Sequence, residues 1–193
     1  DGKRALVNNK GLTKALAGES IGFSLIKVKA ILFDGHEPYL SLKLAKIARE
    51  LNIPTILDAG SLHEGTEKLA NKVDYLVASE KFACQIAGDV KKALTLLAKQ
   101  SPAVVITLGD KGLIWQRGEQ VGNLAACSAN VCDTTGAGDA FHGAFAAAVA
   151  KNMNWLENLK YSSAAGTLCC TKMGARQGLP SKEELEKFRV GKF

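Results

Sequence analysis

The stretch DTTGAGDAFHGAFAAAVA, residues 133–150, joins a loop rich in glycine and threonine directly to an alanine-rich helix that we expect to end near Lys151. Gly136 and Gly138 let the backbone turn tightly and approach a ligand without interference from a Cβ atom. The first backbone N–H groups of a helix have no partner inside the helix, so they can bind an anion such as phosphate. Asp139 lies in the same first turn and could take a proton from a hydroxyl group bound there.

The residues alone also allow simpler explanations of the polar motifs. An isolated Gly-x-Gly-Asp at a helix start is often only a turn followed by a carboxylate that favours the helix dipole, worth about 0.3 to 1 kcal/mol. The stretch TLGDKG, residues 107–112, could be an ordinary turn from a strand into a hairpin. Asp133 could be a turn residue whose side chain bonds to nearby backbone.

Outward from this junction, short β-branched runs alternate with longer segments of helical periodicity, a pattern typical of a mostly parallel α/β sheet. The strands are predicted at residues 30–33, 55–57, 75–77 and 103–108. Helices are predicted over residues 40–51, 93–98 and 155–170, and from Ser181, where Glu184 completes a capping box. The apolar residues 112–115 and the charged turn after them predict an antiparallel hairpin.

Composition limits the possible classes of protein. The 193 residues are 47% hydrophobic and 23% charged, which suits one globular domain. The net charge is +6, but the Lys and Arg residues are scattered, so we expect no nucleic-acid partner and some attraction for an anionic substrate. No segment reads as a membrane span or a secretory signal, which predicts a cytoplasmic protein without a membrane partner. The five cysteines lack zinc-site spacing and are predicted to be buried thiols.

Several motifs together resemble the ribokinase/PfkB carbohydrate kinases. DTTGAGDAF, TLGDKG and the closing TKMGARQGLP, residues 171–180, occur in the order of that family, and DGKR at residues 1–4 is a looser version of its lid segment. The resemblance implies a three-layer α/β/α sandwich with a mostly parallel central sheet and with the lid strands mostly absent from this chain. It also implies a remnant of the lid and connecting segment at residues 1–28, followed by a nucleotide-binding and catalytic domain at residues 29–193.

The resemblance also implies roles for particular residues. Asp139 corresponds to the catalytic base, and the backbone amides of Gly136, Ala137 and Gly138 correspond to the anion hole. The residues implied in binding the cofactor ATP are Thr107, Gly109, Gly112, Ser79 and Gly138. The residues implied in holding metals are Asp133, Thr135 and Gly174 for a monovalent cation such as K⁺, and Glu80 for Mg²⁺.

Two features depart from the family pattern. Where the family carries Asn-x-x-Glu after a strand, this chain has Ser79 and Phe82, so Glu80 is the acidic residue that remains. The family's N-terminal third, which carries much of the acceptor site, is absent from the sequence, so we expect a piece of a longer parent. The first strands would then leave an apolar sheet edge that another segment must cover.

The function implied is ATP-dependent transfer of the γ-phosphoryl group to a hydroxyl of a sugar or sugar-like small molecule. A nucleoside kinase of the same fold and a non-catalytic nucleotide-binding module remain open, and the resemblance also implies a homodimer. A dinucleotide-dependent oxidoreductase would need GxGxxG at the first βα turn, which this sequence lacks. Additional pocket candidates, each of which could equally be solvated or packed, are His36, His63, His142, Asp58 and Arg176.

Overall fold

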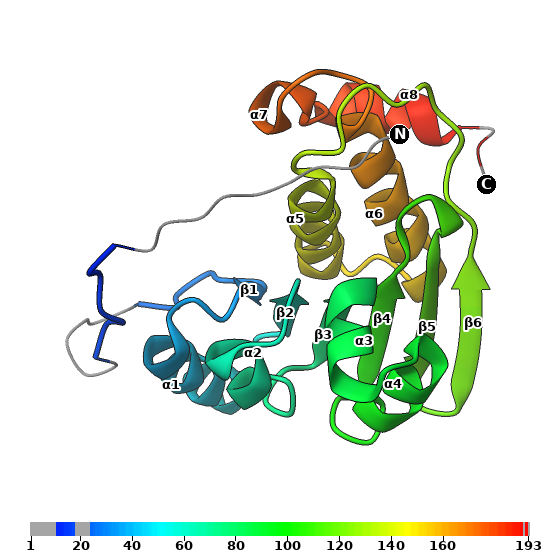
Figure 1. Cartoon of the computed structure of the whole chain (residues 1–193). Coiled ribbons are helices and arrows are strands. Elements are labelled where there is room, and N and C mark those ends of the chain that lie inside the picture. The colour runs from blue at the N-terminus through cyan, green and yellow to red at the C-terminus, as the bar shows by residue number, and fades with distance from the viewer. Residues whose placement is uncertain (1–10, 18–23, 191, 193) are drawn as a thin grey trace. The chain divides into compact units, whose positions relative to one another are not determined.

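The structure, a computed structural model, describes residues 11–17, 24–190 and 192. The DGKR segment at residues 1–4 lies outside the described residues, and the predicted boundary after residue 28 stays a prediction. The chain forms two compact units (Figure 1). We call the described residues within 14–124 the sheet unit, and the described residues within 125–193 together with residues 11–13 the helical unit.

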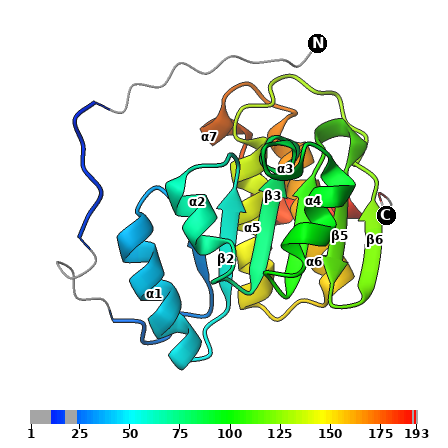
Figure 2. The same cartoon turned by 60° about the horizontal axis from the view of Figure 1, so that its bottom comes forward.

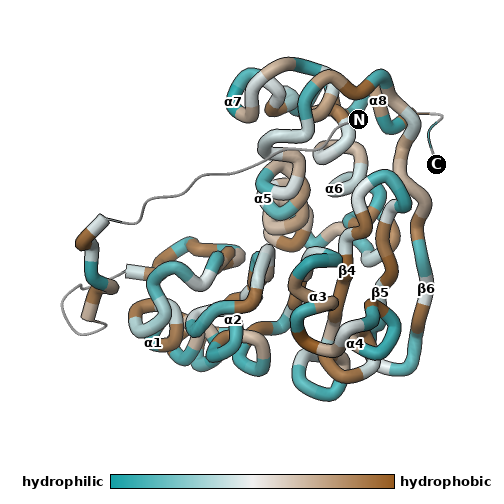
Figure 3. Tube along the Cα trace, in the orientation of Figure 1, coloured by the Kyte–Doolittle hydropathy of each residue, from teal (hydrophilic) through white to brown (hydrophobic). Residues whose placement is uncertain are grey.

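The sheet unit contains a sheet of six strands in sequential order, β1 to β6. The first four strands pair in parallel, and the last two pair antiparallel as a hairpin, as predicted. The strands are β1 (Ile31–Phe33), β2 (Thr55–Ala59), β3 (Tyr75–Ser79), β4 (Ala103–Thr107), β5 (Leu113–Arg117) and β6 (Gln120–Leu124). Hydrophobic residues run along β4 (Figure 3), where the β-branched sequence AVVIT favours an extended, buried backbone.

The helices of the sheet unit lie over one face of the sheet (Figure 2). This placement follows from the strand order, because right-handed crossovers between neighbouring parallel strands put every connecting helix on the same side. Leu76, Phe82 and Leu97 are among the buried residues of the hydrophobic core here. The helices are α1 (Pro38–Glu50), α2 (Glu64–Leu69), α3 (Glu80–Ala87), α4 (Val90–Leu97) and the short 3₁₀ helix η1 (Gly109–Lys111).

The helical unit contains α5 (Ala137–Ala150), α6 (Trp155–Cys169), α7 (Ala175–Gly178) and α8 (Lys182–Arg189). Helices α5 and α6 pack together, with the rings of Phe145 and Trp155 edge to face at 6.1 Å between centroids. The predicted capping box is confirmed, since the Ser181 hydroxyl accepts from the Glu184 amide and the Glu184 carboxylate accepts from the Ser181 amide. None of the helices described is long and apolar enough to cross a membrane.

Some sequence-based predictions need correction. Strand β3 runs two residues further than the predicted 75–77, through Ser79, and α3 begins at the next residue. The prediction of five buried thiols is wrong for Cys84 and Cys132, which are exposed; Cys127 is half-buried and only Cys169 and Cys170 are buried. Helices α2, α3 and α7 were not predicted, because each is short and its apolar residues do not repeat over enough turns.

Candidate functional site

The start of α5 is built around a glycine that no other residue could replace cheaply. Gly136 caps the helix with φ 81°, in the left-handed region, and a Cβ atom there would lie 2.6 Å from the Cβ of Ala175. The Ala137 amide donates to the Thr134 carbonyl at 3.3 Å, and the first bond within the helix runs from the Ala140 amide to the Gly136 carbonyl at 2.8 Å. These two hydrogen bonds fix the backbone just before and just after the start of α5.

Two backbone amides remain open in this first turn. Within the part of the chain that the structure describes, the N–H groups of Gly138 and Asp139 have no acceptor, and both residues are exposed. A Cβ atom placed on Gly138 would meet nothing within 4 Å. These open amides and the helix dipole favour negative charge at this point. The amide of Ala137, in contrast, is already used by Thr134.

Asp133 ties two loops of the helical unit together. One carboxylate oxygen accepts from the Thr135 amide at 2.8 Å, and the other accepts from the Gly174 amide at 2.8 Å. Hydrogen bonds to an ionised group are worth about 1.5 to 3 kcal/mol each, so this bridge holds the turn before α5 against the segment before α7. Asp133, Thr135 and Gly174, predicted together for a monovalent cation, are joined by these two hydrogen bonds.

Two carbonyl oxygens of the same loops lie close to a buried thiol. The Cys169 thiol lies 3.7 Å from the Thr135 carbonyl oxygen and 3.8 Å from the Ala175 carbonyl oxygen. Burial raises the pKa of the Cys169 thiol, and the nearby carboxylates of Asp139 and Asp133 raise it further, so the thiol stays protonated and can donate. A carboxylate with neighbouring carbonyl oxygens is a donor set that suits a hard cation. Among the described residues, no group of three His, Cys, Asp or Glu side chains is placed to hold a metal.

A second group of predicted residues lies at the carboxyl ends of β3 and β4 in the sheet unit. Ser79 and Thr107 are register partners, and the Thr107 hydroxyl donates to the Ala78 carbonyl at 3.3 Å. Gly109 and Gly112 follow with φ of 62° and 89°, conformations that favour glycine. The loop can therefore present its backbone closely to a ligand.

The hydroxyl of Ser79 has a structural role. It caps α3 by accepting from the Phe82 amide at 3.0 Å and donates to the Gly60 carbonyl at 2.8 Å. Phe82 is fully buried in the core. It stands where the family motif has its Glu, so this chain has a core side chain at that position instead of a carboxylate. The departure from Asn-x-x-Glu thus has a consistent local structure, a capped helix anchored by an aromatic side chain.

An ion pair joins these two segments. The Lys111 ammonium group in η1 lies 3.6 Å from the Glu80 carboxylate at the start of α3, with both side chains largely in solvent. Such an exposed pair contributes little stability, about 0 to 1 kcal/mol, so both groups are available to a ligand. Lys111 was not predicted as a site residue, although its place inside the TLGDKG motif was a signal that could have found it.

Comparison with known proteins agrees with these features. Residues 7–182 match the model of the pfkB family carbohydrate kinases. The chain belongs to this family. A relative among curated proteins is the ribokinase of Lactococcus lactis, 30% identical over 146 residues that cover 76% of this chain and 48% of the relative. The chain spans about half the length of the curated relatives that it matches.

Solved structures confirm the predicted ribokinase-like α/β fold for this pfkB family chain. The ribokinase of Thermotoga maritima superposes with a TM-score of 0.80 at 26% identity, covering 90% of this chain and 61% of that chain. The Arabidopsis thaliana ribokinase, solved with ribose and ATP, gives a TM-score of 0.75 at 27% identity, covering 82% and 55%.

The additional pocket candidates in the helical unit are His142 and Arg176. His142 is buried, with Nδ1 2.7 Å from the Gly138 carbonyl oxygen and its ring edge to face with Phe141, so it packs against its own helix. Arg176 is exposed.

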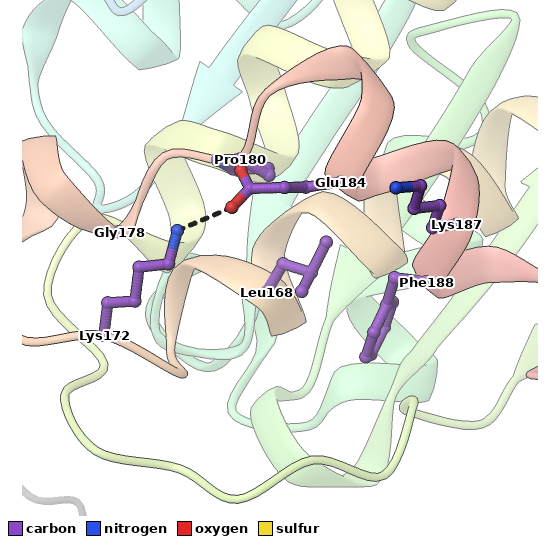
Figure 4. Close-up of a pocket in the computed structure, with 7 residues that line it drawn as sticks. All are labelled: Leu168, Lys172, Gly178, Pro180, Glu184, Lys187 and Phe188. Atoms are coloured by element: carbon purple, nitrogen blue, oxygen red, sulfur yellow. Dashed lines mark hydrogen bonds and ion pairs between the residues drawn. The ribbon is translucent and has the colours of Figure 1, made fainter.

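A groove of about 360 Å³ lies in the helical unit (Figure 4). Leu168, Pro180 and Phe188 give it apolar walls, and Lys172 and Glu184 pair across it at 2.9 Å. The ion pair thus neutralises part of the positive charge of the groove. Of the predicted site residues, only those of the 171–180 segment are close in sequence to the residues that line the groove. The groove therefore offers no chemistry that the predicted motifs would use.

Proposed function

We propose that the protein carrying this chain is a kinase that transfers the γ-phosphoryl group of ATP to a hydroxyl of a sugar or sugar-like molecule. The observation that carries the proposal is the start of α5, where the exposed Asp139 carboxylate stands in the same helical turn as the open amides of Gly138 and Asp139. Phosphoryl transfer needs a base for the acceptor hydroxyl and donors for phosphoryl oxygens, and this turn contains both.

In the proposed mechanism, the Asp139 carboxylate accepts the proton of the acceptor hydroxyl as that oxygen attacks the γ-phosphorus, and ADP leaves. The open amides at the start of α5 stabilise the negative charge on the transferred oxygens. Gly136 sets the direction of these amides through its left-handed backbone, and the bridge of Asp133 keeps the turn in place. Each role uses a group whose geometry is fixed before a ligand arrives, which limits reorganisation during the reaction.

Nucleotide binding is assigned to the loop that follows β4, with Thr107, Gly109 and Gly112 presenting backbone and Lys111 supplying positive charge near the phosphates. Mg²⁺ prefers oxygen ligands and is usually held by one or two carboxylates and the substrate phosphates, which fits the exposed carboxylate of Glu80. Bound there, Mg²⁺ would neutralise phosphate charge. A monovalent cation such as K⁺ would be held by Asp133 and the carbonyl oxygens beside it.

The experiment is a survey of acceptors with the protein in its full natural length. ADP release from ATP and Mg²⁺ is followed with pentoses, ketohexoses, sugar acids, sugar phosphates and nucleosides, each with and without K⁺. We expect one acceptor class to stimulate ADP release strongly. Tight ATP binding without stimulation by any acceptor would instead support a non-catalytic nucleotide-binding module, the alternative that the departure from Asn-x-x-Glu keeps open.

A further inference from the structure

One buried histidine of the helical unit makes a hydrogen bond that the proposed mechanism does not use. His142 lies on α5, one turn after Asp139, and only 5% of its surface is exposed. Its Nδ1 atom lies 2.7 Å from the carbonyl oxygen of Gly138. A carbonyl oxygen only accepts hydrogen bonds, so Nδ1 carries a proton and is the donor. The fold thus selects an imidazole that is protonated on Nδ1.

The carbonyl that accepts this bond belongs to the same peptide group as an open amide of the candidate site. The C=O of Gly138 and the N–H of Asp139 are the two ends of one planar unit. The Asp139 N–H is one of the two amides that have no acceptor in the described part of the chain. Hydrogen bonds in a chain polarise one another and strengthen by about 10 to 30% each. The imidazole therefore makes the Asp139 amide a stronger donor to an anion.

The first turn of α5 is also held in place by its neighbours. In an α-helix the carbonyl of residue 138 accepts from the amide of residue 142, so the backbone and the side chain of His142 both donate to one oxygen. The preceding carbonyl, that of Ala137, lies against α6, where a Cβ atom on Gly166 would lie 3.1 Å from its oxygen. The close approach of α6 limits the movement of Ala137, and His142 limits the movement of the next peptide.

Two roles are open to the His142 imidazole. Its ring packs edge to face on Phe141, with 5.9 Å between the ring centroids, and a buried ring N–H needs an acceptor. A purely structural role would end with that need. A role in the reaction requires, in addition, that the bond changes the Asp139 amide. The amide itself can therefore be measured to separate the two roles.

We propose that His142 is a positioning residue of the anion hole, whose Nδ1–H orients and polarises the Gly138–Asp139 peptide toward the transferred phosphoryl group. This inference rests on the proposed kinase function and adds to it a residue that acts through the backbone without touching a substrate. Such a residue should affect the rate of transfer more than the binding of either substrate, because charge on the phosphoryl oxygens develops during the transfer.

The test compares His142→Leu and His142→Asn in the protein of full natural length. Leucine fills the buried space but donates no hydrogen bond, whereas the amide nitrogen of asparagine, bonded to Cγ as Nδ1 is, can donate to the same carbonyl. The matched control is Phe145→Leu, because Phe145 is buried on the same helix about one turn further along. The unfolding midpoint in urea shows that each variant folds.

The first measurement is the NMR signal of the Asp139 amide in the protein without ligands. Labelling glycine with ¹³C at the carbonyl and aspartate with ¹⁵N selects Gly–Asp pairs, of which this chain has three, at residues 88–89, 109–110 and 138–139. The signal that disappears in Asp139→Asn is that of Asp139. His142→Leu should move this signal to lower ¹⁵N frequency, and His142→Asn should leave it near its position in the parent. The signals of Asp89 and Asp110 should stay in place and serve as internal references.

The second measurement separates kcat from KM, with the acceptor that the survey identifies. Removing one anion-hole donor costs about a hundredfold to a thousandfold in kcat, and losing about 10 to 30% of that energy lowers kcat by about twofold to eightfold. We expect this fall in His142→Leu, with KM for ATP and for the acceptor unchanged and with most of the rate restored in His142→Asn. Phe145→Leu should lower the unfolding midpoint but leave kcat and the Asp139 signal as in the parent.

The outcomes separate this inference from the proposed function. An Asp139 signal that stays in place in His142→Leu, or that moves equally in Phe145→Leu, overturns the role of His142 and leaves the kinase function standing. An unchanged kcat in His142→Leu does the same. A parent that phosphorylates no acceptor overturns the proposed function and this inference with it.

Discussion

The two glycines of GAGD should respond in opposite ways to the same substitution. In Gly136→Ala, an alanine must adopt the left-handed backbone conformation, which costs about 1 to 2 kcal/mol. It must also approach the Ala175 Cβ, placed 2.6 Å away, and such overpacking costs about 1 to 3 kcal/mol. The free energy of unfolding should therefore fall by about 2 to 5 kcal/mol.

Gly138→Ala is the matched control, because it adds the same methyl group to the same turn. Gly138 is not among the residues with positive φ, and its Cβ would meet nothing within 4 Å. Replacing a helical glycine by alanine should then stabilise the protein by about 0.5 to 1 kcal/mol. The methyl group would nevertheless enter the space where we place the phosphate, so turnover should fall by at least about tenfold.

Equilibrium unfolding in urea, followed by far-UV circular dichroism, measures both changes in stability, and ADP release measures turnover. The reasoning about the turn is refuted if Gly136→Ala is as stable as the parent. The placement of the phosphate is refuted if Gly138→Ala is stable and turns over at the parent's rate.

Further predictions concern the bridge, the helix cap and the thiols. Asp133→Ala should lower the free energy of unfolding by about 2 to 4 kcal/mol in urea, because two charge-assisted acceptors are lost; Asp133→Asn, which keeps one, should lose roughly half, and equal losses would contradict the double bridge. Ser79→Ala should cost about 1 to 2 kcal/mol as the cap of α3 and the bond to Gly60 disappear, while a loss below about 0.3 kcal/mol would show that neither bond matters. The pKa of the Cys169 thiol is raised in the folded protein, so the thiol of the unfolded protein ionises first as the pH rises. The contribution of this thiol to stability is therefore complete below the ordinary thiol pKa of 9.0 and is lost as the pH rises through the pKa of the folded protein. The free energy of unfolding in urea should fall between pH 8 and pH 10 in the parent and should fall less in Cys169→Ala. An equal fall in the two proteins would contradict this role of the thiol.

The sequence was enough to predict the sheet but not the contacts that complete the candidate site. β4 was evident because Val104, Val105 and Ile106 form a β-branched apolar run bounded by Pro102 and Gly109. The end of β3 was missed because Ala78 and Ser79 have no strong strand preference.

The partners in long-range contacts had no local signal, even where a motif such as TLGDKG contained one of the two residues. The Glu80–Lys111 ion pair depends on η1 turning back toward the start of α3, and the stacking of His36 on His63 depends on the register of β1 and β2 and on two glycines in contact. Asp133 was predicted as a cation ligand from the family resemblance, and its bridge to Gly174 needs the turn before α7 to be in place. Such pairings are set by tertiary structure, which periodicity and propensity do not encode.

The most direct test of the central claim is the turnover number of Asp139→Asn in the protein of full natural length, measured by ADP release at saturating ATP and acceptor. Asparagine keeps the size of the side chain and its place in the first turn of α5 but cannot take the proton. We predict a fall in kcat of at least about a hundredfold, with KM for ATP and the unfolding midpoint close to those of the parent. A variant that turns over as fast as the parent would contradict the assignment of Asp139 as the base.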